Sequence, residues 1–358
     1  MRPEIDTCMD HFAALGRIFA RTADMLSGSS TTSDPDCERL YEAATRSRQH
    51  NPWFTFREIS RSLHSLAKML KTENLQRWAQ AYPALWQQNH PRQIAVIMAG
   101  NIPLVGFHDM LSVWLSGNTL LAKCSSQDNH LPLAVREIIG NQHPWFKENT
   151  QFTNDFTTAD AVIATGSDNT ARYFSWHYGQ LPHIIRRNRN SAAVLSGQET
   201  AAELHALGED VFSYYGLGCR NVTHLLIPEG YAAETLAEAW QDYQYVADNK
   251  AYMNNIRYQR ALYKCTSTPY LDHGFFLMQE SSALASPVGV VHYSFYADEK
   301  VLPQYVQHHE NQLQCVVGPQ ELKIIKTDLV PLGGSQHPNP WDYADRVDTM
   351  DFLLKLRS

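Results

Sequence analysis

The chain has 358 residues, enough for two domains that each bury a core of their own. Hydrophobic residues make up 44% and charged residues 19% of the sequence, the composition of a soluble globular protein. A net charge of −7 and the lack of a long Lys/Arg run argue against nucleic-acid binding, and no stretch approaches the roughly 18 apolar residues of a membrane-spanning helix.

Six cysteines are scattered through the chain without a C-x-x-C pair or a regular spacing. This pattern is typical of proteins in a reducing cytoplasm, and it argues against a structural zinc site. The first residues include the acids Glu4, Asp6 and Asp10, whereas a secretory signal begins with basic residues and an apolar run. We therefore expect a cytoplasmic protein that holds no metal and binds neither nucleic acid nor membrane.

Residues 1–90 are predicted to form a helical N-terminal region. Apolar residues recur at three- and four-residue spacing over Thr7–Leu26 and over Thr55–Lys71, as on one face of a helix. The segment Gly28–Pro35 between them is predicted to be a loop.

Residues 91–205 differ in character, because short apolar runs alternate with amphipathic helices. The expected strands are Ile94–Ala99, Thr119–Lys123, Asp160–Gly166 and Ser191–Leu195. Helices are expected to end near Ser116 and to cover Pro132–Ile139 and Asp168–Tyr178. Strands that are apolar throughout are buried on both faces, which is typical of a parallel sheet between two helix layers. This pattern predicts a Rossmann-type doubly wound domain.

Residues 206–330 are predicted to form a second, α/β domain, and residues 331–358 a tail. The second domain has expected strands at Thr223–Ile227 and Val288–Phe295 and an expected helix at Ala232–Ala247. The tail is polar and rich in proline before a short helix at Val347–Leu356. We expect it to pack back on the first domain.

Cys219 is the candidate nucleophile of the chain. It follows the corner Gly-Leu-Gly at 216–218, between the end of a helix-like run and the strand at Thr223–Ile227. A thiol on such a turn is accessible while its neighbours hold it in place, and nearby N–H groups or cations favour the reactive thiolate. The alternative is a buried structural cysteine.

Three further segments lie where predicted strands end, namely Met98–Leu104, Leu121–Ser126 and Ala164–Asp168. Ligands of open α/β sheets bind at the carboxyl ends of the strands. The order of these three segments along the chain, with Cys219 after them, resembles the order of the functional segments in the aldehyde dehydrogenase superfamily. Within it, Met-Ala-Gly-Asn-Ile-Pro-Leu-Val-Gly-Phe-His-Asp and Tyr-Tyr-Gly-Leu-Gly-Cys-Arg-Asn-Val are most similar to acyl-CoA reductases related to LuxC, the fatty-acid reductase of bacterial luminescence. The resemblance covers roughly residues 90–350.

The resemblance implies an aldehyde-dehydrogenase-like α/β fold, with a cofactor domain and a catalytic domain, in which Cys219 attacks a thioester. It also implies that Asn101, in the Asn-x-Pro segment, donates a hydrogen bond to the tetrahedral oxyanion, together with the Cys219 N–H. Asparagine before proline is also a common helix cap, here for a helix that begins at Pro103.

The same resemblance implies a nicotinamide cofactor, for which we expect NADPH. Lys123 would contact the adenine-ribose end, Ser125 or Ser126 a 2′-phosphate, and Gly166 and Ser167 a pyrophosphate at the start of a helix. The alternatives are a solvated lysine at the end of a strand and an ordinary strand-to-helix turn.

Two positions depart from the superfamily pattern. Oxidising aldehyde dehydrogenases have a water-activating glutamate where this chain has Arg186, and arginine stays protonated and cannot act as a base. The departure favours transfer of the acyl group to a thiol over hydrolysis. Arg186, Arg187 and Arg189 could bind phosphates of the cofactor or of CoA, or could form a basic surface loop. The carboxylate that binds the nicotinamide ribose in the superfamily is replaced by Ala283.

We therefore expect NADPH-dependent reduction of an acyl-CoA or another acyl thioester to an aldehyde. The alternatives are a CoA-acylating aldehyde dehydrogenase that uses NAD and a non-catalytic binding relative of the same fold. The sequence leaves the acyl chain length, the pathway and the oligomeric state open, a homo-oligomer included.

Overall fold

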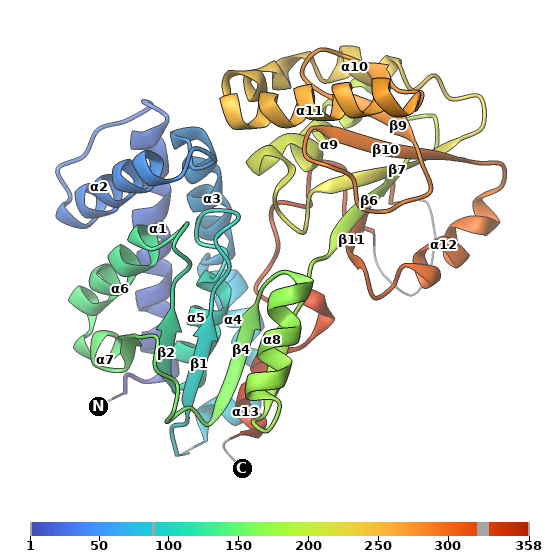
Figure 1. Cartoon of the computed structure of the whole chain (residues 1–358). Coiled ribbons are helices and arrows are strands. Elements are labelled where there is room, and N and C mark those ends of the chain that lie inside the picture. Colours follow the sequence, from blue (N-terminus) through green and yellow to red (C-terminus); the bar gives the residue numbers. More distant parts are fainter. Residues whose placement is uncertain (1, 88–89, 321–328, 357–358) are drawn as a thin grey trace. The chain divides into compact units, whose positions relative to one another are not determined.

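The computed structural model describes residues 2–87, 90–320 and 329–356. The chain divides into two compact units, of which unit 1 comprises Met1–Asn188 and His337–Ser358, and unit 2 comprises Arg189–Gln336. Each unit has its own mainly parallel β-sheet with helices against it, so the chain has an α/β fold (Figure 1). Unit 2 begins upstream of the boundary expected near residue 205, and the C-terminal segment is part of unit 1.

In the described part of unit 1, five parallel strands form a sheet in the order β3-β2-β1-β4-β5. They are β1 (Gln93–Ile97), β2 (Thr119–Lys123), β3 (Thr150–Phe152), β4 (Ala161–Thr165) and β5 (His183–Arg186). Strand β1 pairs with β2 on one side and with β4 on the other, so the direction of winding reverses at β1. This reversal is typical of doubly wound folds, and it places the carboxyl ends of β1, β2 and β4 at one end of the sheet.

The N-terminal region is helical, as the apolar spacing predicts. Helix α1 packs against α2, α3 and α6. The helices of unit 1 are α1 (Ile5–Leu26), α2 (Pro35–His50), α3 (Phe56–Met69), α4 (Thr72–Gln80), α5 (Phe107–Ser116), α6 (His130–Gln142), α7 (Pro144–Glu148), α8 (Asp168–Tyr178) and α13 (Thr349–Lys355), with 3₁₀ turns η1 (Pro83–Trp86) and η5 (Ala344–Arg346).

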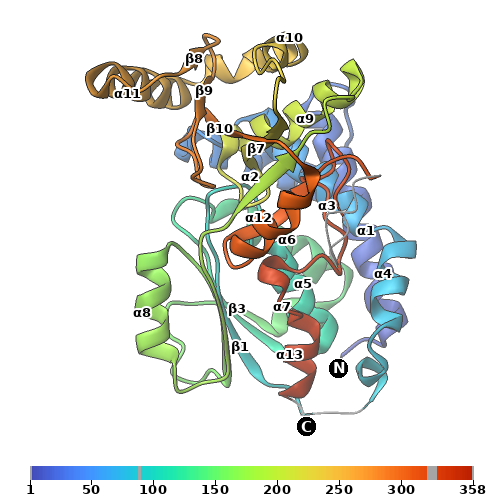
Figure 2. The ribbon, with the colours of Figure 1, turned by 90° about the vertical axis from the view of Figure 1, so that its right-hand side faces the viewer.

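Alternate side chains of β1 enter two different hydrophobic clusters, which explains why its sequence is apolar throughout. Ile94 and Val96 belong to a large cluster that includes residues of α1 and α5. Ala95 and Ile97 belong to a second cluster, to which α8 contributes Phe174. Figure 2 shows the sheet of unit 1 nearly edge-on, with α8 on one side and α5 and α13 on the other. Helices therefore cover both faces, as expected for a parallel sheet.

In the described part of unit 2, six strands form a sheet in the order β11-β6-β7-β10-β9-β8, in which only β8 runs antiparallel to its neighbour. The strands are β6 (Asn190–Val194), β7 (Val222–Pro228), β8 (Leu271–Asp272), β9 (Leu277–Glu280), β10 (Val290–Tyr296) and β11 (Leu313–Val317). The helices are α9 (Ala201–Phe212), α10 (Thr235–Ala239), α11 (Lys250–Thr266) and α12 (Leu302–His308), with 3₁₀ segments η2 (Ser213–Gly216), η3 (Gln241–Asp248) and η4 (Glu299–Val301). Among the described residues of both units, no helix is long and apolar enough to cross a membrane.

Two of the sequence-based assignments are wrong. The run Ser191–Leu195 does form a strand, β6, but this strand pairs with β7 and β11 in unit 2 and not with the sheet of unit 1. An apolar run predicts a buried strand, and nothing in it specifies which of two sheets receives that strand. The expected helix Ala232–Ala247 is divided into α10 and η3 at Trp240, whose indole is buried and donates to the Leu204 carbonyl at 2.9 Å.

Arg186, at the end of β5, forms a buried ion pair within unit 1. Its Nη2 donates to Asp109 Oδ1 on α5 and to Thr349 Oγ1 on α13, each at 2.9 Å, and its Nη1 pairs with the other oxygen of Asp109. Arg186 is 4% exposed and Asp109 6% exposed. The hypothesis that Arg186 binds phosphates or belongs to a basic surface loop is therefore wrong, because its guanidinium is used to join β5, α5 and α13.

We expect Arg186→Ala to lower the free energy of unfolding by roughly 3–5 kcal/mol, because the Asp109 carboxylate would remain buried without its cation. The matched control is Arg187→Ala at the next, exposed position, for which we expect a change below about 0.5 kcal/mol. Urea denaturation of the three proteins measures both values. An equally small change in both variants would mean that the ion pair does not hold the C-terminal segment in place.

Candidate active site

Cys219 lies in a corner of unit 2 between η2 and β7. A few residues before it the backbone is left-handed at three consecutive residues, Tyr214 (φ 52°), Tyr215 (φ 58°) and Gly216 (φ 76°). Glycine adopts this conformation without strain, but each tyrosine does so at a cost of order 1–3 kcal/mol. Such a conformation persists only where the surrounding structure fixes it. The chain therefore reaches Cys219 through a strained turn rather than a flexible loop.

The side chain of Asn221 fixes this corner from inside. It is completely buried, and its Oδ1 accepts the Gly218 N–H at 2.8 Å. Its Nδ2 donates toward the carbonyls of Asp210, Val211 and Ser213, at 3.1, 3.3 and 2.8 Å. One amide thus joins the last turn of α9 to the residue before the candidate nucleophile.

Ser191, on the neighbouring strand β6, holds the corner from the other side. Its hydroxyl donates to the Cys219 carbonyl at 3.1 Å and accepts the Cys315 N–H at 3.3 Å. The Cys219 residue itself is half-buried. Its backbone is therefore anchored on both sides while the residue as a whole is only partly buried, a placement compatible with a nucleophilic thiol.

Asp210, at the end of α9, joins the corner to a later segment of unit 2. Its carboxylate accepts the N–H groups of Gly333 and Ser335 at 2.6 and 2.9 Å. Burial raises the pKa of this carboxyl to about 6, although these hydrogen bonds oppose the shift. Through Asp210 and Asn221, the segment around Gly333 and the Cys219 corner share one buried hydrogen-bond network.

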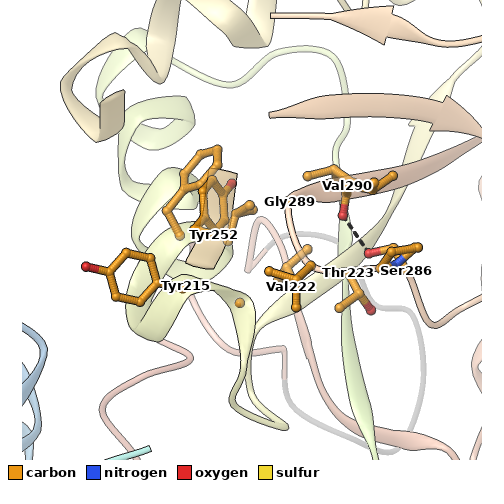
Figure 3. Close-up of a pocket in the computed structure, with 13 residues that line it drawn as sticks. Tyr215, Val222, Thr223, Tyr252, Ser286, Gly289 and Val290 are labelled. Atoms are coloured by element: carbon orange, nitrogen blue, oxygen red, sulfur yellow. Dashed lines mark hydrogen bonds between the residues drawn. The ribbon is translucent and has the colours of Figure 1, made fainter. Parts of the chain in front are cut away.

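A cavity of about 20 Å³ lies behind the corner, among residues of unit 2 (Figure 3). Its walls include Tyr215, Val222, Thr223, Tyr252 and Gly289. This volume is about that of one water molecule. The cavity is too small for an acyl chain or a nicotinamide ring.

Asn101 lies in unit 1, in the turn that follows β1. The helix after this turn, α5, begins at Phe107 with Gly106 at its N-cap position. The alternative role of Asn101 as the cap of a helix beginning at Pro103 is therefore wrong. The physical reason is Leu104, whose left-handed backbone (φ 56°) interrupts any helix between Pro103 and Gly106.

The predicted cofactor residues lie at the carboxyl ends of β2 and β4, in unit 1. Lys123 and Ser126 are exposed, and Ser125 is half-buried with its hydroxyl accepting the Gln127 N–H at 3.2 Å. Cys124 lies between Lys123 and Ser125 in the chain, and burial raises the pKa of its thiol to about 12. A thiol with this pKa is protonated at neutral pH, so Cys124 is not a competing nucleophile.

In the turn after β4, two of the groups that could bind a pyrophosphate already form hydrogen bonds within the protein. The Gly166 N–H donates to the Arg186 carbonyl at 3.3 Å, and Ser167 is the N-cap of α8, where its hydroxyl accepts the Thr170 N–H at 3.4 Å. A Cβ at Gly166 would lie 2.9 Å from the side chain of Thr170. This glycine is therefore required for the packing of α8 on β4.

Ala283 is the residue that the sequence resemblance matches to the ribose-binding carboxylate. Its carbonyl accepts two histidine hydrogen bonds. The Nδ1 atoms of His224 and His292 lie 3.0 and 2.9 Å from that oxygen, so each ring carries its proton on Nδ1. Burial lowers the pKa of His224 to about 4 and also lowers the pKa of His292. His224 is therefore neutral near pH 7, and both histidines fix the backbone around Ala283 through these hydrogen bonds.

The predicted residues are divided between the two units. Unit 1 has Asn101, Lys123, Ser125, Ser126, Gly166 and Ser167, all near the carboxyl ends of adjacent parallel strands, and unit 2 has Cys219. Sequence analysis missed Ser191, Asp210 and Asn221. Only Asn221 had a signal in the sequence, because it is a polar residue between a Gly-Cys corner and an apolar strand.

Residues 35–239 match the family model described as acyl-CoA reductase (LuxC). No curated protein sequence matches the chain significantly.

Among solved structures, the chain is similar to aldehyde dehydrogenase 21 from Physcomitrella patens in complex with the product succinate, with a TM-score of 0.60 and 11% identity over 99% of this chain and 87% of that one. An NAD-dependent aldehyde dehydrogenase from Sinorhizobium meliloti gives a TM-score of 0.59 and 12% identity over 87% and 71% of the two chains. For the NAD⁺ complex of aldehyde dehydrogenase from Bacillus cereus, the TM-score is 0.53 and the identity is 14%, over 86% of this chain and 71% of that one. At these identities the likeness establishes an aldehyde-dehydrogenase-like fold.

We expect Asn221→Ala to destabilise the protein by about 1–3 kcal/mol, because the buried Gly218 N–H would lose its acceptor. The matched control is Asn254→Ala on α11, an exposed asparagine of the same unit, with an expected change below about 0.5 kcal/mol. Urea denaturation provides the comparison. Equal stability of the two variants would show that Asn221 does not fix the corner.

Proposed function

The chain belongs to the acyl-CoA reductase (LuxC) family, and we propose that it reduces an acyl thioester to an aldehyde with NADPH, through an acyl group bound to Cys219. The observation that supports this proposal most strongly is the corner at Cys219. A half-buried cysteine follows a strained turn, Asn221 accepts the N–H of the residue before it, Gly218, and Ser191 donates to the Cys219 carbonyl. A structural cysteine needs no such support.

In the proposed reaction, the Cys219 thiolate attacks the carbonyl carbon of the thioester. A new carbon–sulfur bond forms, the bond to the CoA sulfur breaks, and CoA leaves as its thiolate. We propose that the side-chain amide of Asn101 and the Cys219 N–H donate to the carbonyl oxygen while it is negatively charged. Such donors act best when they are already in place, because then no reorganisation accompanies the development of charge.

A dinucleotide fits the residues at the carboxyl ends of β1, β2 and β4. The winding reverses at β1, and ligands of doubly wound folds bind at that point. Exposed Lys123 and Ser126 would bind the adenine-ribose end and its 2′-phosphate, with Ser125 beside them. Because the Gly166 N–H is used by the sheet, the pyrophosphate would face Ser167 and the first turn of α8.

NADPH, when bound, supplies a hydride to the carbonyl carbon of the acyl group on Cys219. The product on Cys219 is a thiohemiacetal in its oxyanion form. When the electron pair of the oxyanion re-forms the carbonyl, the carbon–sulfur bond breaks, the aldehyde is released, and Cys219 leaves as the thiolate that begins the next cycle. The Bacillus cereus relative binds NAD⁺ in its structure, which supports a nicotinamide cofactor here. The sequence resemblance matches Arg186 to the water-activating glutamate. Because arginine stays protonated it cannot act as a base, which supports slow hydrolysis of the acyl group.

Incubation of the wild-type protein with an acyl-CoA, without cofactor, should add one acyl group to its intact mass. Cys219→Ala should remain unmodified, whereas the matched control Cys265→Ala, which lacks an exposed cysteine of the same unit, should still be acylated. Added CoA should remove the adduct, because thiol exchange reverses its formation. Rapid release of free fatty acid, or acylation of Cys219→Ala, would contradict the proposal.

For the cofactor, we expect NADPH to be preferred over NADH, because Lys123 and the two serines after it include no acid that repels a 2′-phosphate. Lys123→Ala should raise the KM for NADPH by about tenfold and change the KM for NADH little. Lys147→Ala, an exposed lysine of the same unit on α7, is the control. Equal kcat/KM of the wild-type protein for the two cofactors would refute the preference.

A further inference from the structure

The turn after β1, from Gly100 to Leu104, contains Asn101 and contacts a buried carboxylate that has no part in the proposed reaction. Asp128 lies in the turn after β2 and is 3% exposed. Its Oδ2 accepts the Leu104 N–H at 2.7 Å. Its Oδ1 is buried and has no hydrogen-bond partner within the described part of the chain. Burial raises the pKa of this carboxyl to about 7, and the bond from Leu104 opposes the shift.

Leu104 is the residue of this turn that most needs an anchor. Its backbone is left-handed, a conformation that a leucine keeps only where the surroundings impose it. The carbonyl of the preceding residue, Pro103, accepts the Ser62 hydroxyl at 2.7 Å. Together, Asp128 and Ser62 hold the two sides of the peptide group that joins Pro103 to Leu104.

The other end of the turn packs directly on the segment that contains Asp128. A Cβ at Gly100 would lie 2.5 Å from Ser125 Oγ, so only glycine permits this approach. The N–H of Asp128 in turn donates to the Ser125 carbonyl at 3.2 Å. Asn101 therefore lies between two fixed points, Gly100 and Leu104, and both depend on the turn from Ser125 to Asp128.

We propose that Asp128 is a positioning residue for Asn101: by holding the Leu104 N–H, it keeps the turn after β1 in the conformation that presents the Asn101 amide to the substrate oxygen. This inference rests on the proposed function. The half-satisfied carboxylate supports it, because a buried oxygen without a partner destabilises the folded protein and stability alone does not account for its presence.

The first test is the effect of Asp128 on kcat for acyl-CoA reduction. We expect Asp128→Ala to lower kcat about 10- to 100-fold, because a displacement of about 1 Å in a positioned group has an effect of that size, with a smaller change in KM. Asp128→Asn keeps a side-chain oxygen for the Leu104 N–H and should restore most of the loss. Ser60→Ala is the control, because it removes a buried hydrogen bond of unit 1, to the Ala23 carbonyl, away from the turn.

A double-mutant cycle separates positioning from a general structural role. Asn101→Ala should lower kcat about 10²- to 10³-fold. If Asp128 acts through Asn101, then Asp128→Ala in the Asn101→Ala background should cause little further loss. The proposal would be overturned if the loss of kcat in the double variant equalled the product of the losses in the two single variants. A kcat of Asp128→Ala close to that of the wild-type protein would also overturn it.

Amide hydrogen exchange provides a readout that does not depend on activity. In Asp128→Ala, exchange in the peptide that contains Leu104 should accelerate by at least about tenfold, while Asp128→Asn and Ser60→Ala leave it near the wild-type rate. Unchanged exchange in Asp128→Ala would overturn the proposal. If the wild-type protein reduces no acyl thioester, the proposed function fails, and exchange alone then decides whether Asp128 holds the turn.

Discussion

The left-handed backbone at Tyr214, Tyr215 and Gly216 is the constraint on which the account of this molecule depends. It turns the chain sharply from α9 into β7 and places Cys219 between two regular elements. Two tyrosines in this conformation cost free energy, so other contacts must compensate. The compensation comes from Asn221, whose buried amide bonds to both sides of the turn.

The same arrangement recurs in unit 1, where a left-handed Leu104 follows Asn101. In both places an irregular turn precedes or contains the side chain for which we propose a catalytic role, and one buried polar side chain holds the backbone of that turn. Asn221 does this for Cys219 by accepting the Gly218 N–H, and Asp128 does it for Asn101 by accepting the Leu104 N–H. Functional groups that are held rigidly lose less free energy on binding the transition state than groups on mobile loops.

The sequence predicts the local features of this structure well and the long-range ones poorly. Apolar runs mark the strands β1, β2 and β4, Asn101 directly follows the glycine that ends the first of these runs, and Cys219 follows a Gly-Leu-Gly corner. Such signals lie within a few residues. Arg186 was misjudged because its partner Asp109 is 77 residues away. Asp128, Asp210 and Ser191 were missed for the same reason, since nothing near them in the chain indicates what they contact. The run at Ser191 shows that an apolar pattern does not specify which sheet a strand joins.

The central claim is that the acyl group resides on Cys219 before it is reduced. The most direct test compares the time at which acyl-Cys219 forms with the time at which NADPH is consumed. Wild-type protein, acyl-CoA and NADPH would be mixed rapidly and quenched at intervals, with acyl-Cys219 measured by intact mass and NADPH by absorbance. The account predicts that the adduct appears before NADPH is consumed, at a rate at least equal to turnover, and declines as the aldehyde forms. Consumption of NADPH with no adduct on Cys219, or an adduct that forms more slowly than turnover, would contradict it.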